Sequence, residues 1–161
     1  MNSSAEPHGA EQLRIRRLSS SDLSAVTRID AHHTGQRKRS YWRGVLSEFL
    51  GRRRDGRARV GLAAQAGRRV VGYLLGEVRA FEFGSEPCGW IFAVGVDPSV
   101  LRGGVGAALL REACRAFHRA GVARVRTMVR RSDVPVLAFF RSSGFAGGAY
   151  VQLELDVSSQ P

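Results

Sequence analysis

The sequence has little cysteine, almost no lysine and no long apolar run. Cys88 and Cys114 are its only cysteines. They lie far apart and form no Cys-x-x-Cys pair, so neither a disulfide framework nor a cysteine zinc site is indicated. No apolar stretch approaches the roughly 20 residues that a membrane helix needs, and residues 1–12 lack the apolar centre of a secretory signal. We therefore expect a cytoplasmic, soluble protein with two buried thiols, no metal and no membrane partner.

Acidic residues are also scarce relative to basic ones. The chain has 25 Lys and Arg against 14 Asp and Glu, a formal net charge of +11. Clustered cations would indicate a nucleic-acid partner. Here nearly all the cations are arginines, spread along the chain, and Lys38 is the single lysine. We therefore expect solvated surface charge and no nucleic-acid partner, although a phosphate-bearing small ligand is compatible with this charge.

The 161 residues have the length of one domain. Residues 1–12 are polar and without periodicity, which predicts a disordered leader before a single domain over residues 13–161. Periodicity and capping residues predict this order: a strand from Leu13, a helix from about Asp22, a helix over Ser40–Leu50, a hairpin of Ala58–Gln65 and Arg69–Val78, a strand over Trp90–Val96, a helix from Gly104 to Gly121, a strand over Arg124–Val129, a helix over Val134–Ser143 and a strand over Tyr150–Val157. This order predicts a mixed α/β fold with one sheet and helices on both faces.

The most informative segment is the junction between the strand over Trp90–Val96 and the helix that follows. Three glycines, Gly103, Gly104 and Gly106, lie at the start of that amphipathic helix. The first amides of a helix have no internal partner and point along the positive end of its dipole, so such a start binds anions. The spacing fits neither a P-loop nor a dinucleotide fingerprint. A tight turn whose glycines serve packing alone is the structural alternative.

Two linked motifs resemble the GNAT superfamily of acyl-CoA-dependent N-acyltransferases. The segment DPSVLRGGVGAAL, residues 97–109, resembles the superfamily's pyrophosphate loop, and DVPVLAFFRSSGF, residues 133–145, resembles its closing helix. Their order and separation also match, with one helix and one strand between them. The resemblance implies a GNAT-like single domain, with a central mixed, mostly antiparallel sheet flanked by helices and a splayed central strand that binds coenzyme A.

The resemblance further implies an N-acetyltransferase with acetyl-CoA as the acyl donor and no metal. The acceptor would be an amine of a small molecule or a protein, attacking directly in a ternary complex. Backbone groups of Val94, Gly95 and Val96 would bond the pantetheine arm, and Asp133 and Phe140 would belong to the same site. The pyrophosphate would lie on the remaining predicted donor-binding residues: Leu101, Arg102, Gly103, Gly104, Val105, Gly106 and Ala107.

The sequence departs from the superfamily pattern at positions that matter for catalysis. Leu101 stands where Gln or Arg is usual, with Arg102 beside it as a substitute donor. Asp133 replaces an asparagine, and Phe140 replaces the tyrosine that commonly protonates the departing thiolate. Trp90 stands where some relatives place a glutamate base. The usual general base and general acid are therefore both absent.

The reaction needs a group that takes a proton from the acceptor amine, because an alkylamine with a pKa near 10.4 is mostly protonated at pH 7. By residue type, Glu77 on the predicted hairpin and His33 after the first predicted helix are candidate bases, and Tyr150 is a candidate acid. For each of them an ordinary role is the favoured interpretation: Glu77 as a carboxylate on a strand surface, His33 as a solvated loop residue and Tyr150 as an amphipathic residue at a sheet edge. Proton removal through water, and departure of the thiolate without a dedicated acid, also stay open.

Two other functions remain compatible with the sequence. A catalytically weak acyl-CoA-binding module on the same fold is suggested by Phe140 and Trp90, and a basic nucleic-acid-binding protein is the more distant alternative. By analogy with the superfamily, the region Thr34–Trp42 would line the entrance for the acceptor. The sequence does not determine the acceptor, the preferred acyl group or the oligomeric state, and a homodimer is compatible with it.

Overall fold

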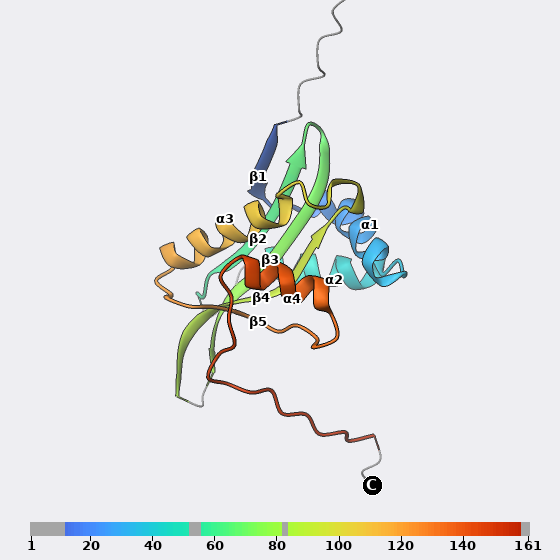
Figure 1. The fold of residues 1–161 in the computed structure, drawn as a ribbon. Helices are drawn as coiled ribbons and strands as arrows, with labels where there is room; N and C mark the ends of the chain where they lie inside the picture. The colour runs from blue at the N-terminus through green and yellow to red at the C-terminus, as the bar shows by residue number, and fades with distance from the viewer. Residues whose placement is uncertain (1–11, 52–55, 82–83, 159–161) are drawn as a thin grey trace, which may run out of the picture. The chain divides into compact units, whose positions relative to one another are not determined.

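The computed structural model describes residues 12–51, 56–81 and 84–158 (Figure 1). The predicted leader, residues 1–12, therefore lies outside the described residues except for Gln12. The chain divides into two compact units, Met1–Met128 and Val129–Pro161. We describe each unit by itself.

The first unit holds a five-stranded sheet with the strand order β1-β2-β3-β4-β5. Neighbouring strands are antiparallel from β1 to β4, whereas β5 runs parallel to β4. This confirms the predicted mixed, mostly antiparallel sheet. The elements of the unit are β1 (Leu13–Arg17), the 3-10 turn η1 (Ser20–Asp22), α1 (Leu23–Thr34), α2 (Arg39–Leu50), β2 (Arg59–Ala66), β3 (Arg69–Phe81), β4 (Ser85–Val96), the 3-10 turn η2 (Pro98–Val100), α3 (Val105–Arg119) and β5 (Val125–Thr127).

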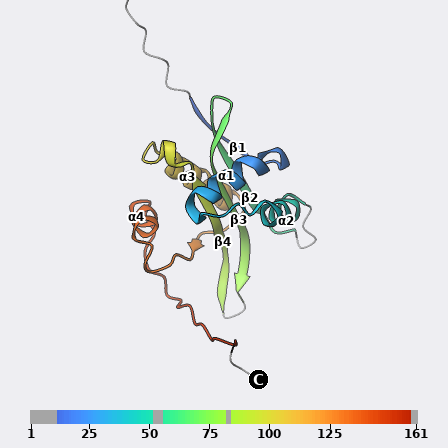
Figure 2. The ribbon, with the colours of Figure 1, turned by 90° about the vertical axis from the view of Figure 1, so that its right-hand side faces the viewer.

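Helices cover both faces of the sheet, α1 and α2 on one side and α3 on the other (Figures 1 and 2). The α1–α2 side is filled by an apolar cluster that includes Ile29, Trp42 and Tyr73. On the α3 side, Phe117 packs directly on the strands. A Cβ added at Gly89 would lie 2.5 Å from the Phe117 ring, and one at Gly76 would lie 2.9 Å from it. These two glycines allow α3 to approach the sheet closely.

Several element boundaries differ from the predictions; for example, β3 extends to Phe81 and β5 covers only Val125–Thr127. Helix α1 continues to Thr34 and ends at Gly35, which adopts a left-handed conformation with a φ of 71°. His33 therefore lies in the last turn of α1 and not after the helix. Strand β4 begins at Ser85, five residues before the predicted start at Trp90. The polar composition of Ser85–Pro87 concealed this pairing, because the end of a hairpin forms ladder hydrogen bonds without needing a buried face.

The second unit holds one helix, α4 (Val134–Ser142), whose N-cap is Asp133. The predicted strand over Tyr150–Val157 is wrong, since residues 149–157 have no regular secondary structure. Val151, Leu153 and Leu155 are 81%, 88% and 74% exposed. Alternation of apolar and polar residues specifies a strand only where a neighbour supplies hydrogen bonds, and within the described residues no strand pairs with this segment.

None of the helices in the described ranges is both long and apolar enough to cross a membrane.

Candidate acyl-CoA site

The central feature of the site is the place where β4 and β5 separate. The two strands pair at three positions only, the last of which joins Ile91 to Thr127. The Thr127 hydroxyl donates to the carbonyl oxygen of Ile91 over 2.9 Å. Strand β4 then continues for five residues, Phe92 to Val96, while β5 ends. Along these residues β4 keeps β3 on one side and has no strand partner on the other among the described residues.

A β-bulge decides which backbone groups face the unpaired edge. Leu75 lies opposite Ala93 and Gly76 opposite Ile91, so Phe92 is an extra residue in β4. Beyond the bulge, the amide of Asp97 donates to the Val71 carbonyl on β3. Because the backbone groups of successive residues alternate between the two edges, Gly95 also bonds toward β3. The backbone groups of Val94 and Val96 are therefore the ones directed to the unpaired edge.

A histidine from α1 contacts this edge. His33 Nε2 lies 2.8 Å from the carbonyl oxygen of Val96. A carbonyl only accepts, so Nε2 carries the hydrogen, and in a neutral ring Nδ1 is then the acceptor nitrogen. Local sequence patterns do not predict this contact, because 63 residues separate the two partners.

Asp97 anchors the end of β4 and the loop that follows. Its side chain is 3% exposed, and Oδ2 accepts from Arg28 of α1 and, over 2.6 Å, from Arg69 of β3. Oδ1 accepts from the Ser99 amide over 3.0 Å and from the Ser99 hydroxyl over 2.7 Å. Burial by itself would raise the pKa of Asp97, but the hydrogen bonds from Arg28, Ser99 and Arg69 outweigh it and hold the pKa well below its ordinary value.

The loop after Asp97 leads into α3. Arg102 has a φ of 67°, a left-handed conformation that is uncommon outside glycine, and Gly104 has a φ of 76° as the N-cap of α3. Residues 101–104 are exposed, and Gly104 has no side chain with which to cap the helix. The amide of Ala108 donates to the carbonyl oxygen of Gly104, and this is the first hydrogen bond of α3. The preceding amides, those of Val105, Gly106 and Ala107, are thus available to an anion.

The family of the chain follows from a match over most of its length. The profile of the family described as Acetyltransferase (GNAT) family matches residues 23–145. The chain belongs to the GNAT acetyltransferase family. This family match includes all of the site just described.

One curated relative and two solved structures show what this GNAT chain is similar to. It is 36% identical over 87 residues to the mycothiol acetyltransferase of Saccharomonospora viridis, a match that covers 52% of this chain and 28% of that protein. The aminoglycoside N-acetyltransferase AAC(6')-Iy, solved with CoA, has a TM-score of 0.78 at 17% identity, covering 94% of this chain and 99% of that one. An aminoglycoside acetyltransferase from an uncultured soil metagenomic sample, solved with sisomicin, has a TM-score of 0.68 at 20% identity, covering 89% and 95%. Both structures have the same fold as this chain.

The candidate base Glu77 lies on β3 between two arginines. Its Oε1 is 2.8 Å from Arg79 Nε, its Oε2 is 3.7 Å from Arg59 Nε, and its side chain is 13% exposed. Together with Phe92 of β4 these residues line a small pocket of about 190 Å³. An amine proton would have to compete with the two guanidinium groups for this carboxylate. The catalytic role of Glu77 stays a prediction.

The other predicted site residues, Asp133, Phe140 and Tyr150, belong to the second unit. Asp133 Oδ1 accepts from the Val136 amide over 3.3 Å, which is the hydrogen bond of a helix N-cap. Phe140 is buried, and its ring centroid lies 5.0 Å from that of Phe139 and 5.1 Å from that of Phe145. Tyr150 is 54% exposed. The roles predicted for these three residues stay predictions.

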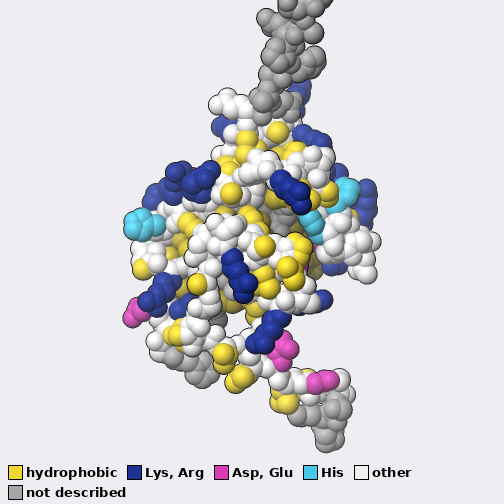
Figure 3. All heavy atoms as spheres, viewed as in Figure 1, with side chains coloured by type: hydrophobic (Ala, Val, Ile, Leu, Met, Phe, Trp, Pro, Cys, Tyr) yellow, Lys and Arg dark blue, Asp and Glu magenta, His cyan; other side chains and the backbone are white. Residues whose placement is uncertain are grey.

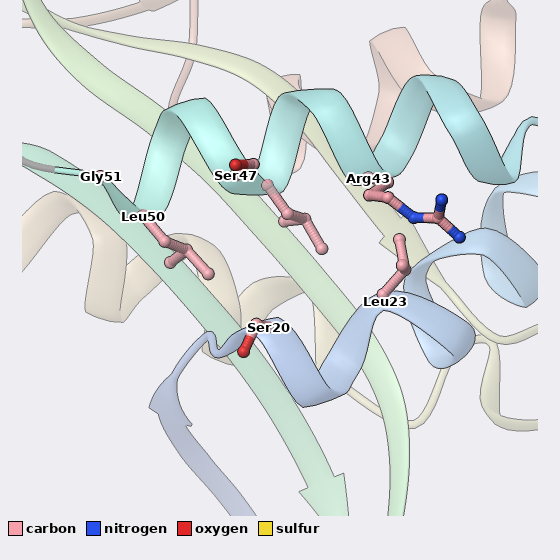
Figure 4. Close-up of a pocket in the computed structure, with 7 residues that line it drawn as sticks. Ser20, Leu23, Arg43, Ser47, Leu50 and Gly51 are labelled. Atoms are coloured by element: carbon pink, nitrogen blue, oxygen red, sulfur yellow. The ribbon is translucent and has the colours of Figure 1, made fainter.

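A larger groove of about 380 Å³ lies between the start of α1 and helix α2 (Figure 4). Ser20 and Leu23 line one side of it, and Arg43, Ser47 and Leu50 of α2 line the other. None of its lining residues belongs to β4 or to the loop that precedes α3, so it is separate from the candidate acyl-CoA site. In the described part of the chain, no group of three or more His, Cys, Asp or Glu side chains is placed to hold a metal ion.

Proposed function

We propose that this chain is an N-acetyltransferase that transfers the acetyl group of acetyl-CoA to an amine. The proposal rests on two backbone surfaces that follow one another along the chain. The first is the edge of β4 that has no strand partner from Phe92 onward, and it leads through Asp97 to the second, the amides at the start of α3. An extended amide chain joined to a pyrophosphate requires such a pair of surfaces, hydrogen-bonding groups along a strand and then an anion site.

The chain's own residues would hold the donor mainly through backbone groups. Val94 and Val96 direct their amides and carbonyls to the open edge, where they can bond the two amides of a pantetheine arm. The amides of Val105, Gly106 and Ala107 would face the pyrophosphate, and Arg102 can add a charge-assisted hydrogen bond. When bound, acetyl-CoA supplies the thioester whose carbonyl carbon the amine nitrogen attacks directly in a ternary complex.

The acceptor is proposed to be an amine of a small molecule. In support, the solved structures of similar fold include aminoglycoside acetyltransferases, and the curated relative is a mycothiol acetyltransferase. This chain corresponds to 28% of that relative's length, so the relative's own substrate is not assigned to it. We further propose that the protein acts in the cytoplasm, where acetyl-CoA is available.

Thermal-shift titration with CoA and acetyl-CoA tests the donor assignment, because a ligand that binds only the native state raises the melting temperature. We expect saturating CoA to raise it in the wild type. Gly106→Glu should abolish the shift while the protein stays folded, since a carboxylate would occupy the place of the pyrophosphate. The matched control is Gly44→Glu in α2, where an added Cβ meets nothing within 4 Å.

Two results would contradict this assignment. The first is a wild type whose melting temperature does not respond to CoA. The second is a folded Gly106→Glu protein that binds CoA as tightly as the Gly44→Glu control. Turnover of acetyl-CoA against an amine panel then separates a transferase from a protein that only binds acyl-CoA.

A further inference from the structure

The groove of about 380 Å³ between the start of α1 and helix α2, here called the α1–α2 groove, has no part in the proposed function. Its apolar lining consists of Leu23, Leu46 and Leu50. Leu46 is 2% exposed, whereas Leu50 is 40% exposed. Arg43 lies two turns before Leu50 in α2, about 10 Å along the helix axis. The groove therefore has a guanidinium group toward one end and a leucine toward the other (Figure 4).

Arg43 is the single charged residue among the described residues that line the α1–α2 groove. It is exposed, and in the described chain it pairs with no carboxylate. Asp22 and Glu48 adjoin lining residues in the sequence, but both are directed elsewhere. Asp22 is 5% exposed on its side chain and lies 2.8 Å from Arg16 Nη2, and Glu48 lines the smaller pocket beside Phe92. The charge of Arg43 is thus not neutralised within the described residues.

A second arginine adds to the positive charge at this end of the groove. Arg39 lies one turn before Arg43, and residues four apart are neighbours on a helix surface. Its Nη1 donates to the hydroxyl of Ser24, the neighbour of Leu23, over 3.0 Å. No carboxylate of the described chain pairs with Arg39 either. This end of the α1–α2 groove is therefore complementary to an anion.

We propose that the α1–α2 groove binds a carboxylate with an unbranched apolar tail, such as the anion of a medium-chain fatty acid. The carboxylate accepts charge-assisted hydrogen bonds from Arg43, and the tail leaves water along the three leucines. A peptide that ends in a carboxylate fits less well. Its backbone polar groups would be covered by leucines, and among the described lining side chains only the hydroxyls of Ser20 and Ser47 could bond them. The groove shares no residue with the candidate acyl-CoA site, so this inference goes beyond the proposed function.

An NMR titration of the isotope-labelled, CoA-saturated protein tests the groove, because CoA then occupies the proposed donor site. The probes are sodium octanoate, sodium acetate without the tail, n-octylamine with the opposite charge, and N-acetyl-Leu-Leu as a peptide carboxylate. We expect octanoate to bind most tightly of the four, and at least about tenfold more tightly than acetate. It should shift the amide signals of Leu23, Ser47 and Gly51, with or without CoA.

Variants at the two ends of the groove separate the head group from the tail. Arg43→Gln should weaken octanoate binding roughly two- to fivefold, the range for an exposed ion pair, and Arg43→Glu should weaken it further. Leu50→Ser should weaken octanoate binding several-fold and leave acetate binding unchanged. The matched controls are Arg111→Gln and Leu153→Ser, which should leave octanoate binding unchanged. All four positions are exposed, so we expect melting temperatures near that of the wild type.

Four results would overturn the proposal. They are octanoate that binds no more tightly than acetate or n-octylamine, shifts confined to residues outside the groove, Arg43→Glu protein that binds octanoate as tightly as the wild type, and tighter binding of N-acetyl-Leu-Leu, which would make a peptide carboxyl terminus the ligand. Failure of the proposed function has a different signature. CoA would then not stabilise the wild type, while octanoate would still shift the signals of the groove.

Discussion

His33 and Val96 connect the last turn of α1 to the open edge of β4, through a hydrogen bond of 2.8 Å from Nε2 to the carbonyl oxygen. This bond fixes the orientation of a peptide group that we propose binds the donor. Replacing His33 by alanine should therefore weaken CoA binding by about fivefold, the effect of a hydrogen bond worth about 1 kcal/mol. His33→Gln can restore a donor and should recover most of the affinity.

The same pair of variants tests His33 as a general base. Glutamine donates a hydrogen bond but cannot take up a proton at neutral pH. If His33 is the base, His33→Gln should keep CoA affinity and lose turnover by roughly 100-fold or more. If turnover is retained, His33 serves only to orient Val96. CoA titration and steady-state kinetics on one acceptor amine measure the two effects separately.

Asp97 should contribute strongly to stability. Asp97→Asn leaves Arg28 and Arg69 beside a neutral amide, and we expect a loss of about 3 kcal/mol in the free energy of unfolding, as for a broken buried ion pair. Urea unfolding at pH 7 measures this loss. Glu86→Gln, which neutralises an exposed carboxylate, should change the free energy of unfolding by less than about 0.5 kcal/mol.

The contribution of Asp97 should also depend on pH in a defined direction. The hydrogen bonds that lower its pKa in the folded state stabilise the fold only while the carboxylate is charged. The stabilising contribution of Asp97 is therefore fully present above its pKa in the unfolded chain, about 3.9. It is lost as the pH falls from there toward the lower pKa that Asp97 has in the folded protein. The difference between wild type and Asp97→Asn should shrink below about pH 4. A difference that stays constant between neutral and acidic pH would contradict the charge-based account.

Phe140 tests whether the missing tyrosine matters. A CoA thiol has a pKa near that of cysteine, about 8.5, so its thiolate can depart without a dedicated acid. We expect Phe140→Tyr to leave CoA affinity nearly unchanged and turnover equal or moderately higher, whereas Tyr150→Phe should lower turnover only if Tyr150 is the substitute acid. Steady-state turnover of both variants distinguishes these cases. Loss of all turnover in Phe140→Tyr, with CoA binding intact, would mean that Phe140 is an apolar wall for the acceptor.

The basic charge should not produce tight nucleic-acid binding. Ion pairs with carboxylates engage at least seven arginines: Arg16, Arg28, Arg59, Arg69, Arg79, Arg115 and Arg119. On the face drawn in Figure 3, the basic side chains lie in separate patches among apolar and acidic ones. A binder of nucleic acid concentrates its cations along one track. Submicromolar binding to random DNA at physiological salt, weakening steeply as salt is added, would contradict this prediction.

The sequence by itself determined the family and most of the elements of the fold. Strong apolar periodicity and three glycines at a helix start predict α3 and its anion-binding loop, because these signals depend on neighbours within one or two turns of the chain. The GNAT family match over residues 23–145 confirms the family inferred from the two motifs. The hairpin of β2 and β3 was predicted for the same reason, since its turn and its apolar alternation are local.

Only the tertiary structure decided the features that depend on distant residues. The bulge at Phe92 sets which backbone groups of β4 face the open edge, and the pairing with β3 and β5 creates it. Arg28 and Asp97 meet across 69 residues, and His33 and Val96 across 63. The segment Tyr150–Val157, in which apolar and polar residues alternate, was also decided by the tertiary structure. An amphipathic pattern becomes a strand only where the fold provides hydrogen-bond partners for its backbone.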